Sequence, residues 1–247
     1  ENTDDYIEDR NFHISKDIEE WYSVSLLPLK QKREKEEREQ YLRQQPDNFF
    51  IIHQEKGKWG FIDKTGNIVI PCIYNKVDDF HDGLAKVRKN GKWGFIDRTG
   101  NEIIPCVYDN CSDFKEGLAQ IEKEGEYGFI DKAGNVVIPC IYDDVDDFRD
   151  GLARVRKDGK YGFIDKVGNE ITPCVYDDYY NFKEGLARVQ TKGKWGVIDK
   201  VGNEITPCIY DDIDDFHEGL ARVKKDDKYG FIDKVGNETT PCIYDDV

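Results

Sequence analysis

A segment of 34 residues occurs six times in this chain, and it constrains the fold more than any other feature of the sequence. Residues 58–74 read KWGFIDKTGNIVIPCIY, and residues 92–108 read KWGFIDRTGNEIIPCVY. The constant interval is plainest for an aromatic position and a cysteine position: Trp59, Trp93, Tyr127, Tyr161, Trp195 and Tyr229, with Cys72, Cys106, Cys140, Cys174, Cys208 and Cys242. A unit this short cannot bury a core alone, so the copies are expected to stack on their neighbours.

Each copy predicts three β-strands joined by short turns. Residues 151–157, GLARVRK, alternate apolar and charged side chains with the period of two that is typical of a half-buried strand. An Asn-Gly or Asp-Gly pair, such as Asn90–Gly91, then favours a tight hairpin turn into the WGFID segment. A second glycine-containing turn precedes the third strand, for which residues 170–176, EITPCVY, are an example.

These strands predict an all-β repeat array over residues 48–247, an open, curved stack or solenoid of three-stranded antiparallel meander units. The units are expected at about residues 48–81, 82–115, 116–149, 150–183, 184–217 and 218–247. A closed six-bladed β-propeller is the alternative, although a propeller blade usually has four strands.

Residues 1–47 predict helix instead. Ile14, Ile18 and Trp21 fall on one helical face. The following segment, LKQKREKEEREQYLRQQ, has the Lys30–Glu34 spacing that supports an exposed helix. We expect an N-terminal helical cap that covers the open edge of the first unit; a spacer to a further domain is the alternative.

The charge of the chain restricts its partners. It has 51 Asp and Glu residues against 36 Lys and Arg residues, a net charge of −15 in 247 residues. Such an acidic chain is not expected to bind nucleic acid, whose phosphates require clustered cations. No apolar run approaches the length of a membrane span. The chain starts with Glu1 and contains no methionine, so a processed or cut polypeptide is expected.

The repeated pattern, Trp or Tyr followed by G-F-I-D-K-x-G-N-x-x-x-P-C-x-Y and then by F-x-E/D-G-L-A-x-V, resembles the bacterial WG repeat family. The resemblance covers residues 48–247. It implies a multi-copy all-β domain that serves as an interaction or surface module, and it brings no catalytic motif.

The repeated aromatic and cysteine positions have two interpretations each. The Trp/Tyr position predicts a structural core, with glycine admitting a neighbouring backbone; a ligand-binding stripe that stacks on sugars is the alternative. The six cysteines predict buried free thiols. Their 34-residue spacing does not fit the closely spaced ligands of a typical zinc site. Equivalent positions in stacked units are expected to lie too far apart in space for disulfides. The acidic connections, such as DDVDDF, predict a solvated face rather than a calcium site because their pattern drifts between copies.

The sequence favours a protein that is not an enzyme and needs no metal or cofactor, because nearly every polar group recurs in every copy while an active site is a single asymmetric group of residues. The leading hypothesis is a scaffold for protein–protein interaction. Its candidate surface is a basic row on the first strands: Lys86, Arg88, Arg154, Arg156, Arg188, Arg222 and Lys224.

Several partners are compatible with such a scaffold. The array has no degenerate closing unit, which favours head-to-tail self-association. Carbohydrate or cell-wall binding through the Trp/Tyr stripe is the rival, and a sensor or regulatory domain of a larger protein is a further alternative. The free, periodic cysteines favour a reducing or anaerobic setting, and therefore the cytoplasm.

Overall fold

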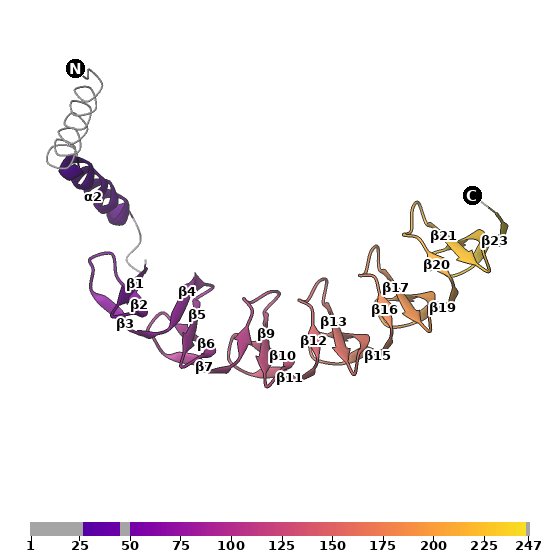
Figure 1. Cartoon of the computed structure of the whole chain (residues 1–247), viewed down its shortest axis with the longest axis horizontal. Helices are drawn as coiled ribbons and strands as arrows, with labels where there is room; N and C mark the ends of the chain where they lie inside the picture. Colours follow the sequence, from indigo (N-terminus) through magenta and orange to yellow (C-terminus); the bar gives the residue numbers. More distant parts are fainter. Residues whose placement is uncertain (1–26, 45–49, 246–247) are drawn as a thin grey trace, which may run out of the picture. The chain divides into compact units, whose positions relative to one another are not determined.

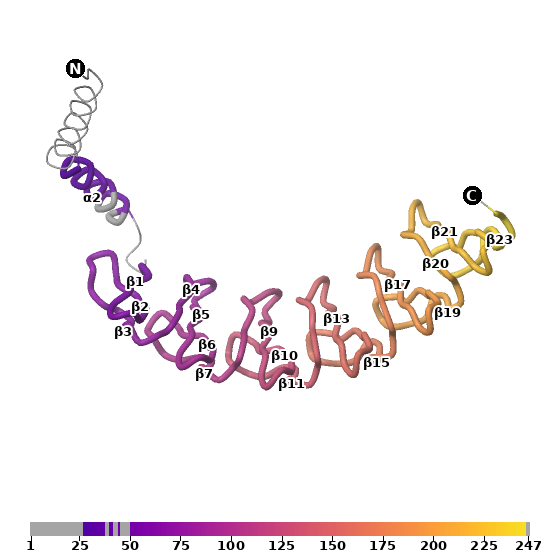
Figure 2. Tube along the Cα trace, viewed as in Figure 1, coloured from indigo at the N-terminus to yellow at the C-terminus, as the bar shows by residue number. Residues whose placement is uncertain are grey.

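The computed structural model of this chain describes residues 27–44 and 50–245. Two compact units meet at the Ile73–Tyr74 bond, and each is considered by itself. The predicted all-β repeat array with one N-terminal helix is confirmed in the described residues. It consists of six antiparallel sheets in tandem along the chain, none of which closes on itself (Figures 1 and 2).

The first unit contains one helix and one sheet. Helix α2 spans Leu27–Gln44, and all its described side chains are exposed. The predicted Lys30–Glu34 pair is present at 4.0 Å, and Arg33 Nε donates to Glu37 Oε1 at 2.8 Å. Residues 1–26, including the predicted apolar helical face, lie outside the described residues, so the capping role stays a prediction. The sheet has the order β1-β2-β3, with β1 Ile51–Glu55, β2 Lys58–Ile62 and β3 Ile68–Tyr74.

The second unit contains five four-stranded antiparallel sheets, whose strands are adjacent in chain order. The sheets are β4 Lys76–His81, β5 Leu84–Lys89, β6 Lys92–Asp97 and β7 Glu102–Tyr108; β8 Asn110–Cys111, β9 Leu118–Lys123, β10 Glu126–Asp131 and β11 Val136–Tyr142; β12 Asp144–Val145, β13 Leu152–Lys157, β14 Lys160–Asp165 and β15 Glu170–Tyr176; β16 Asp178–Tyr179, β17 Leu186–Thr191, β18 Lys194–Asp199 and β19 Glu204–Tyr210; β20 Asp212–Ile213, β21 Leu220–Lys225, β22 Lys228–Asp233 and β23 Glu238–Tyr244.

The first strand of each of these five sheets was not expected from the sequence. It comes from the acidic connection, as in β8, where Cys111 pairs with Ile121 of β9. The prediction of three strands in each repeat is therefore one strand too few for the five sheets of the second unit. The structural repeat also begins about six residues earlier than the predicted boundaries, because residues 110–142 rather than 116–149 form one sheet. In four of the five sheets the first strand has only two residues, which leave no alternating pattern in the sequence.

The Trp/Tyr-Gly pair faces a bulge in the last strand of each sheet. In the second sheet Trp93 pairs with Tyr108 and Phe95 pairs with Ile104, so β7 uses two more residues than β6 over the same span. A Cβ atom on Gly94 would lie 2.8 Å from the backbone nitrogen of Cys106 in that bulge. The glycine is therefore required by a close backbone approach, as predicted for this position.

The hydrophobic core of the second unit lies between consecutive sheets. One buried cluster joins Phe129, Ile138 and Tyr142 of the third sheet to Val145, Phe148, Ala153, Val155 and Ile164 of the fourth. The pairs of sheets on either side are joined in the same way. A fully buried side chain of this size contributes roughly 1.5–3 kcal/mol. The prediction that each copy forms a wall for the next is therefore confirmed for residues 74–245. None of the described helical segments is long and apolar enough to cross a membrane.

Candidate interaction surface

A buttressed turn holds the last strand of every sheet in place. In the third sheet Asp131 Oδ1 accepts the backbone N–H groups of Ala133 and Asn135 at 2.9 Å each, and Asn135 Nδ2 donates to Asp131 Oδ2. The equivalent aspartates, Asp63 and Asp97, also accept a threonine hydroxyl, from Thr65 and Thr99. These hydrogen bonds stabilise the carboxylate and lower the pKa of Asp63 and Asp97 to about 2. The turn is a structural element, which explains the D-x-x-G-N sequence.

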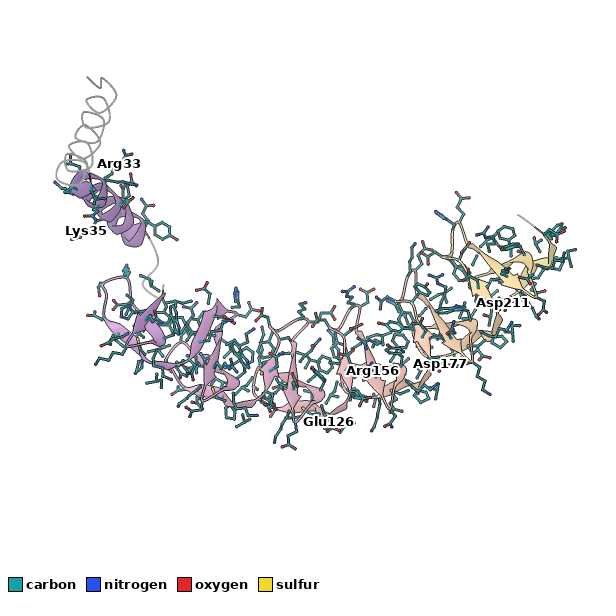
Figure 3. The ribbon with its side chains drawn as sticks, in the orientation of Figure 1. Arg33, Lys35, Glu126, Arg156, Asp177 and Asp211 are labelled. Carbon is teal, nitrogen blue, oxygen red and sulfur yellow. The ribbon has the colours of Figure 1, made fainter. Side chains whose placement is uncertain are left out.

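A second aspartate ties consecutive sheets of the second unit together. Asp177, labelled in Figure 3, accepts from Lys160 of the fourth sheet and from the backbone N–H of Lys192 in the fifth. Asp109 and Asp211 make the equivalent two contacts. The lysine hydrogen bond is the main cause of the lowered pKa of each of these carboxylates. The Tyr-Asp pair after each bulge therefore sets the link to the next sheet.

Four of the seven cations of the predicted basic row are engaged by acidic connections. Arg154 is 9% exposed and donates from Nη1 to Asp144 at 2.8 Å and from Nε to Asp146 at 3.0 Å. The other three are Lys86, which pairs with Asp78 and Asp113, Arg188, which pairs with Asp215, and Arg222, which pairs with Asp214. The sequence predicted a basic row separate from the acidic connections, and at these four positions the structure corrects it. Opposite charges pair after the chain folds. Arg154 and Arg222 pair with the connection of their own sheet, whereas Arg188 pairs with that of the next sheet and Lys86 pairs with both.

The other three cations of that row also lie against the protein. Arg88 Nε donates to the Gly91 carbonyl at 3.1 Å. Lys224 pairs with Asp227 at 2.9 Å. The Nε of Arg156 is buried without a hydrogen-bond partner. An interaction role for the basic row stays a prediction, and the geometry does not favour it.

The repeated aromatics are mostly half-buried. Trp195 is 8% exposed and packs against Tyr180 with ring centroids 5.1 Å apart, whereas Trp59, Trp93, Tyr127, Tyr161 and Tyr229 have intermediate exposure. Three cations lie over the Trp93 ring, the nearest being Lys76 Nζ at 5.2 Å from the centroid. A sugar would need an open ring face, so these contacts do not favour a carbohydrate stripe.

The repeated cysteines are half-buried free thiols rather than fully buried ones. Cys106 Sγ lies 3.9 Å from the Val87 carbonyl oxygen of its own sheet, and Cys208 Sγ lies 3.5 Å from that of Val189. Burial raises the pKa of Cys106 to about 11 and that of Cys111 to about 12. Within residues 27–44 and 50–245, no group of His, Cys, Asp and Glu side chains has the geometry of a metal site.

The bulge of each last strand exposes two apolar residues that the sequence analysis did not single out. In β7 these are Pro105 and Val107, on either side of the half-buried Cys106. We call the set the bulge row; in the second unit it comprises Pro105, Val107, Pro139, Ile141, Pro173, Val175, Pro207, Ile209, Pro241 and Ile243. Val107 is 44% exposed and Ile141 is 40% exposed. The P-C-V/I motif is visible in the sequence. Assigning its side chains to one face of the strand would have required strict alternation, and the bulge breaks that alternation.

A pocket recurs between neighbouring sheets of the second unit. One example, about 310 Å³, lies between the β4–β5 turn, β6 and the β8–β9 connection. Phe95 and Phe114 form its floor, with ring centroids 5.0 Å apart. Equivalent pockets at residues 146–182 and 181–216 are smaller, at about 100 and 20 Å³. A more open example in the last sheet, lined by residues 188–231, is about 660 Å³. The acidic connections therefore line concave sites in addition to pairing with the cations.

The repeated sequence matches the family described as WG containing repeat. The matched residues are 59–93, 93–127, 127–161, 161–195, 195–229 and 229–247, which is well over half of the chain. The chain belongs to the WG repeat family. A comparison with curated proteins finds no match.

Solved structures resemble this WG repeat protein only distantly. Kluyveromyces lactis Hsv2 aligns with a TM-score of 0.32 and 10% identity over 77% of this chain and 72% of that one. A eukaryotic initiation factor aligns with a TM-score of 0.37 and 9% identity over 76% of this chain and 61% of the other. The extracellular domain of BT3049 from B. thetaiotaomicron aligns with a TM-score of 0.31 and 12% identity over 77% of this chain and 34% of that one. Scores this low carry no conclusion about this chain.

The WG pair itself is thus an architectural feature of the repeat. Its glycine admits the bulge, and the bulge exposes the proline and the β-branched residue. In this WG repeat protein the residues that are most regular in sequence build the sheet, while the surfaces open to a partner are the bulge row and the pockets between sheets.

Proposed function

We propose that this WG repeat protein is a non-catalytic scaffold that binds another protein through the bulge row. The supporting observation is that an exposed proline and an exposed valine or isoleucine recur at the same strand positions in all five sheets of the second unit. Single exposed apolar side chains are ordinary on protein surfaces, but a set in register is typical of an interaction site.

The geometry explains how the bulge row would bind. The row lies on strands that pair on one side only within their sheets, because β7, β11, β15, β19 and β23 each end the strand order. Proline has no N–H group and β-branched residues have few rotamers, so little conformational entropy is lost when a partner covers them. Several weak apolar contacts, one for each sheet, would then add along the array.

A variant of four residues tests this proposal. Val107→Thr, Ile141→Thr, Val175→Thr and Ile209→Thr together remove exposed apolar groups and keep β-branching. The matched control is Val167→Thr, Val201→Thr and Val235→Thr, because these valines are about 70% exposed at turns outside the bulges. Quantitative affinity capture should retain a protein with the wild type and the control but lose it with the bulge variant. Burial of apolar area predicts at least about a tenfold weaker complex for two or more contacted sheets.

The same variants test self-association. Light scattering over a concentration series should show whether copies of the chain assemble and whether the bulge variant abolishes the assembly. If the bulge variant captures the same proteins in the same amounts as the wild type, the bulge row is not the binding surface. If the wild type captures none and stays monomeric at every concentration, the scaffold proposal is wrong.

A further inference from the structure

The pocket between the second and third sheets differs from its equivalents in the charge of its rim. Four aspartates and one lysine line it: Asp78, Asp79, Asp82, Asp113 and Lys86. The pocket at residues 146–182 has three aspartates and two arginines, and the one at residues 181–216 has two acidic and two basic residues. The first two of these pockets share the aromatic floor, so they differ mainly in the charge of their rims.

The single lysine does not neutralise this rim. Lys86 Nζ lies 3.0 Å from Asp113 Oδ1 and 3.3 Å from Asp78 Oδ2. Lys76 Nζ, from outside the pocket lining, lies 3.6 Å from Asp78 Oδ1. Asp82 Oδ2 pairs with Lys132 Nζ at 2.8 Å, from outside the pocket lining. Asp79 is exposed and has no partner among the described residues.

The pocket also differs in size from the one at residues 146–182. In the pocket at residues 146–182, the guanidinium of Arg154 occupies the equivalent position and binds two aspartates. Lys86 stands at that position in the pocket between the second and third sheets, which is about three times larger, at about 310 Å³ against about 100 Å³. A flexible cationic side chain fits such a volume, with its stem on the rings and its charge near the free carboxylate.

We propose that this pocket receives a lysine or arginine side chain from an extended segment of the partner protein. The inference rests on the proposed function, in which the partner is a protein, and it adds the chemistry of one contact. Three features select the occupant: an aromatic floor, an excess of carboxylates and a free aspartate at the rim. Complementary charge would set the register of the partner along the array, while the bulge row supplies apolar area.

Backbone amide NMR with short peptides tests the proposal. The probes are Ac-GSKSKSG-NH2 and Ac-GSRSRSG-NH2, and Ac-GSESESG-NH2 is the charge control. We expect saturable shifts at the amides of Asp79, Gly83 and Phe114 with the basic probes only. The pocket at residues 181–216 should not respond, because its acidic and basic residues balance.

Two variants of equal charge give the contrast. Asp79→Asn should weaken the binding of the basic peptides about threefold to fivefold, which is the effect of losing one exposed charge pair. Asp158→Asn removes an exposed carboxylate in the β13–β14 turn, outside the pocket, and should leave the affinity unchanged. Equal weakening by both variants, equal shifts at residues 181–216, or no saturable shift up to about 10 mM peptide would overturn the inference.

The outcome separates this inference from the proposed function. The bulge variant keeps every residue of the pocket and should bind the basic peptides like the wild type. If the peptides fail to bind while capture still depends on the bulge row, the pocket inference is wrong and the scaffold proposal stands. If the peptides bind and capture does not depend on the bulge row, the scaffold surface is wrong and the cation pocket stands.

Discussion

Lys132 Nζ lies 2.8 Å from Asp82 Oδ2, although the two residues are 50 positions apart in the chain. The same interval joins Lys166 to Glu116, Lys200 to Asp150 and Lys234 to Glu184. Each pair links the turn between the first two strands of one sheet to the turn before the last strand of the next sheet. We call these four ion pairs the ladder. They hold neighbouring sheets in register on the exposed side, while the apolar clusters hold the sheets together in the interior.

The ladder predicts a weak, salt-dependent coupling between sheets. In a double-mutant cycle with Lys132→Gln and Asp82→Asn, urea unfolding should show a favourable coupling at low salt that disappears at about 1 M salt, because exposed pairs are screened. Asparagine suits position 82, where φ is 50°. A coupling that persists at high salt would mean that the contact is not a simple exposed ion pair.

The glycine of the WG pair predicts a large loss of stability on substitution. A Cβ atom at Gly128 would lie 2.7 Å from the Pro139 carbonyl oxygen, so Gly128→Ala must displace the bulge. We expect the free energy of unfolding to fall by about 2–4 kcal/mol. Gly125→Ala is the control, because nothing lies within 4 Å of its Cβ position and only its φ of +86° is unfavourable; it should cost about 1 kcal/mol. Equal losses in urea unfolding would contradict the role given to the bulge.

One repeat lacks a lysine that four others pair with an aspartate 17 positions later. Glu126, labelled in Figure 3, occupies the position of Lys92 and Lys160, which pair with Asp109 and Asp177. Among the described residues, Asp143, the equivalent aspartate, accepts only the Gly159 N–H at 3.4 Å. Glu126→Lys should therefore raise the free energy of unfolding by about 0.3–1 kcal/mol at low salt.

The control for that substitution has the same change of charge. Glu124→Lys lies in the neighbouring turn, and Lys192 shows that lysine is accepted there, with φ of 53°. Thermal unfolding at low and high salt should distinguish the two variants. If Glu124→Lys stabilises as much as Glu126→Lys, the gain comes from the lower net charge and not from a pair with Asp143.

The turn aspartates predict a loss of stability in acid. Hydrogen bonds from Thr65 and Asn67 lower the pKa of Asp63 to about 2, and the pKa of Asp97 is lowered to the same value by Thr99 and Asn101. A lowered folded-state pKa stabilises the fold above the unfolded value, near 4, and this contribution is lost as pH falls towards 2. Urea midpoints should be constant above about pH 5 and decline below pH 4.

A threonine variant isolates the cause of that pKa. Thr99→Val removes the hydroxyl that donates to Asp97 Oδ1 at 2.7 Å, and carboxyl NMR titration should show a higher pKa for Asp97. The pKa of Asp131, whose turn has Ala133 at this position, should not change. A pKa of Asp97 that stays near 2 in this variant would assign the effect to the backbone N–H groups and the Asn101 amide.

The tryptophans predict the result of a quenching experiment. In single-tryptophan proteins, acrylamide should quench Trp195, 8% exposed, less than the half-buried Trp59 or Trp93. Cations lie over the Trp93 ring and the Tyr180 ring packs against Trp195, so added oligosaccharides should leave the emission of these two unchanged. Saturable emission changes with a glucan would instead support the carbohydrate-binding hypothesis.

The sequence by itself determined the local structure of this protein. Its 34-residue interval, its alternating strands and its Asn-Gly and Asp-Gly turns predicted the β-strands, because period and turn chemistry are local properties. The need for a neighbour was also predictable, since no copy has enough apolar residues to bury a core alone. The glycine beside Trp93 was correctly expected to admit another backbone segment. The sequence did not indicate which segment this would be.

The tertiary structure decided which polar and apolar groups remain available. Lys86 and Arg154 read as outward cations in the alternating strands, yet the fold brings the acidic connections onto them and neutralises most of their charge. The short first strands and the bulge that exposes Val107 depend on pairing between residues, which a local pattern does not specify. The candidate surfaces therefore come from contacts between segments, and only the folded chain reveals them.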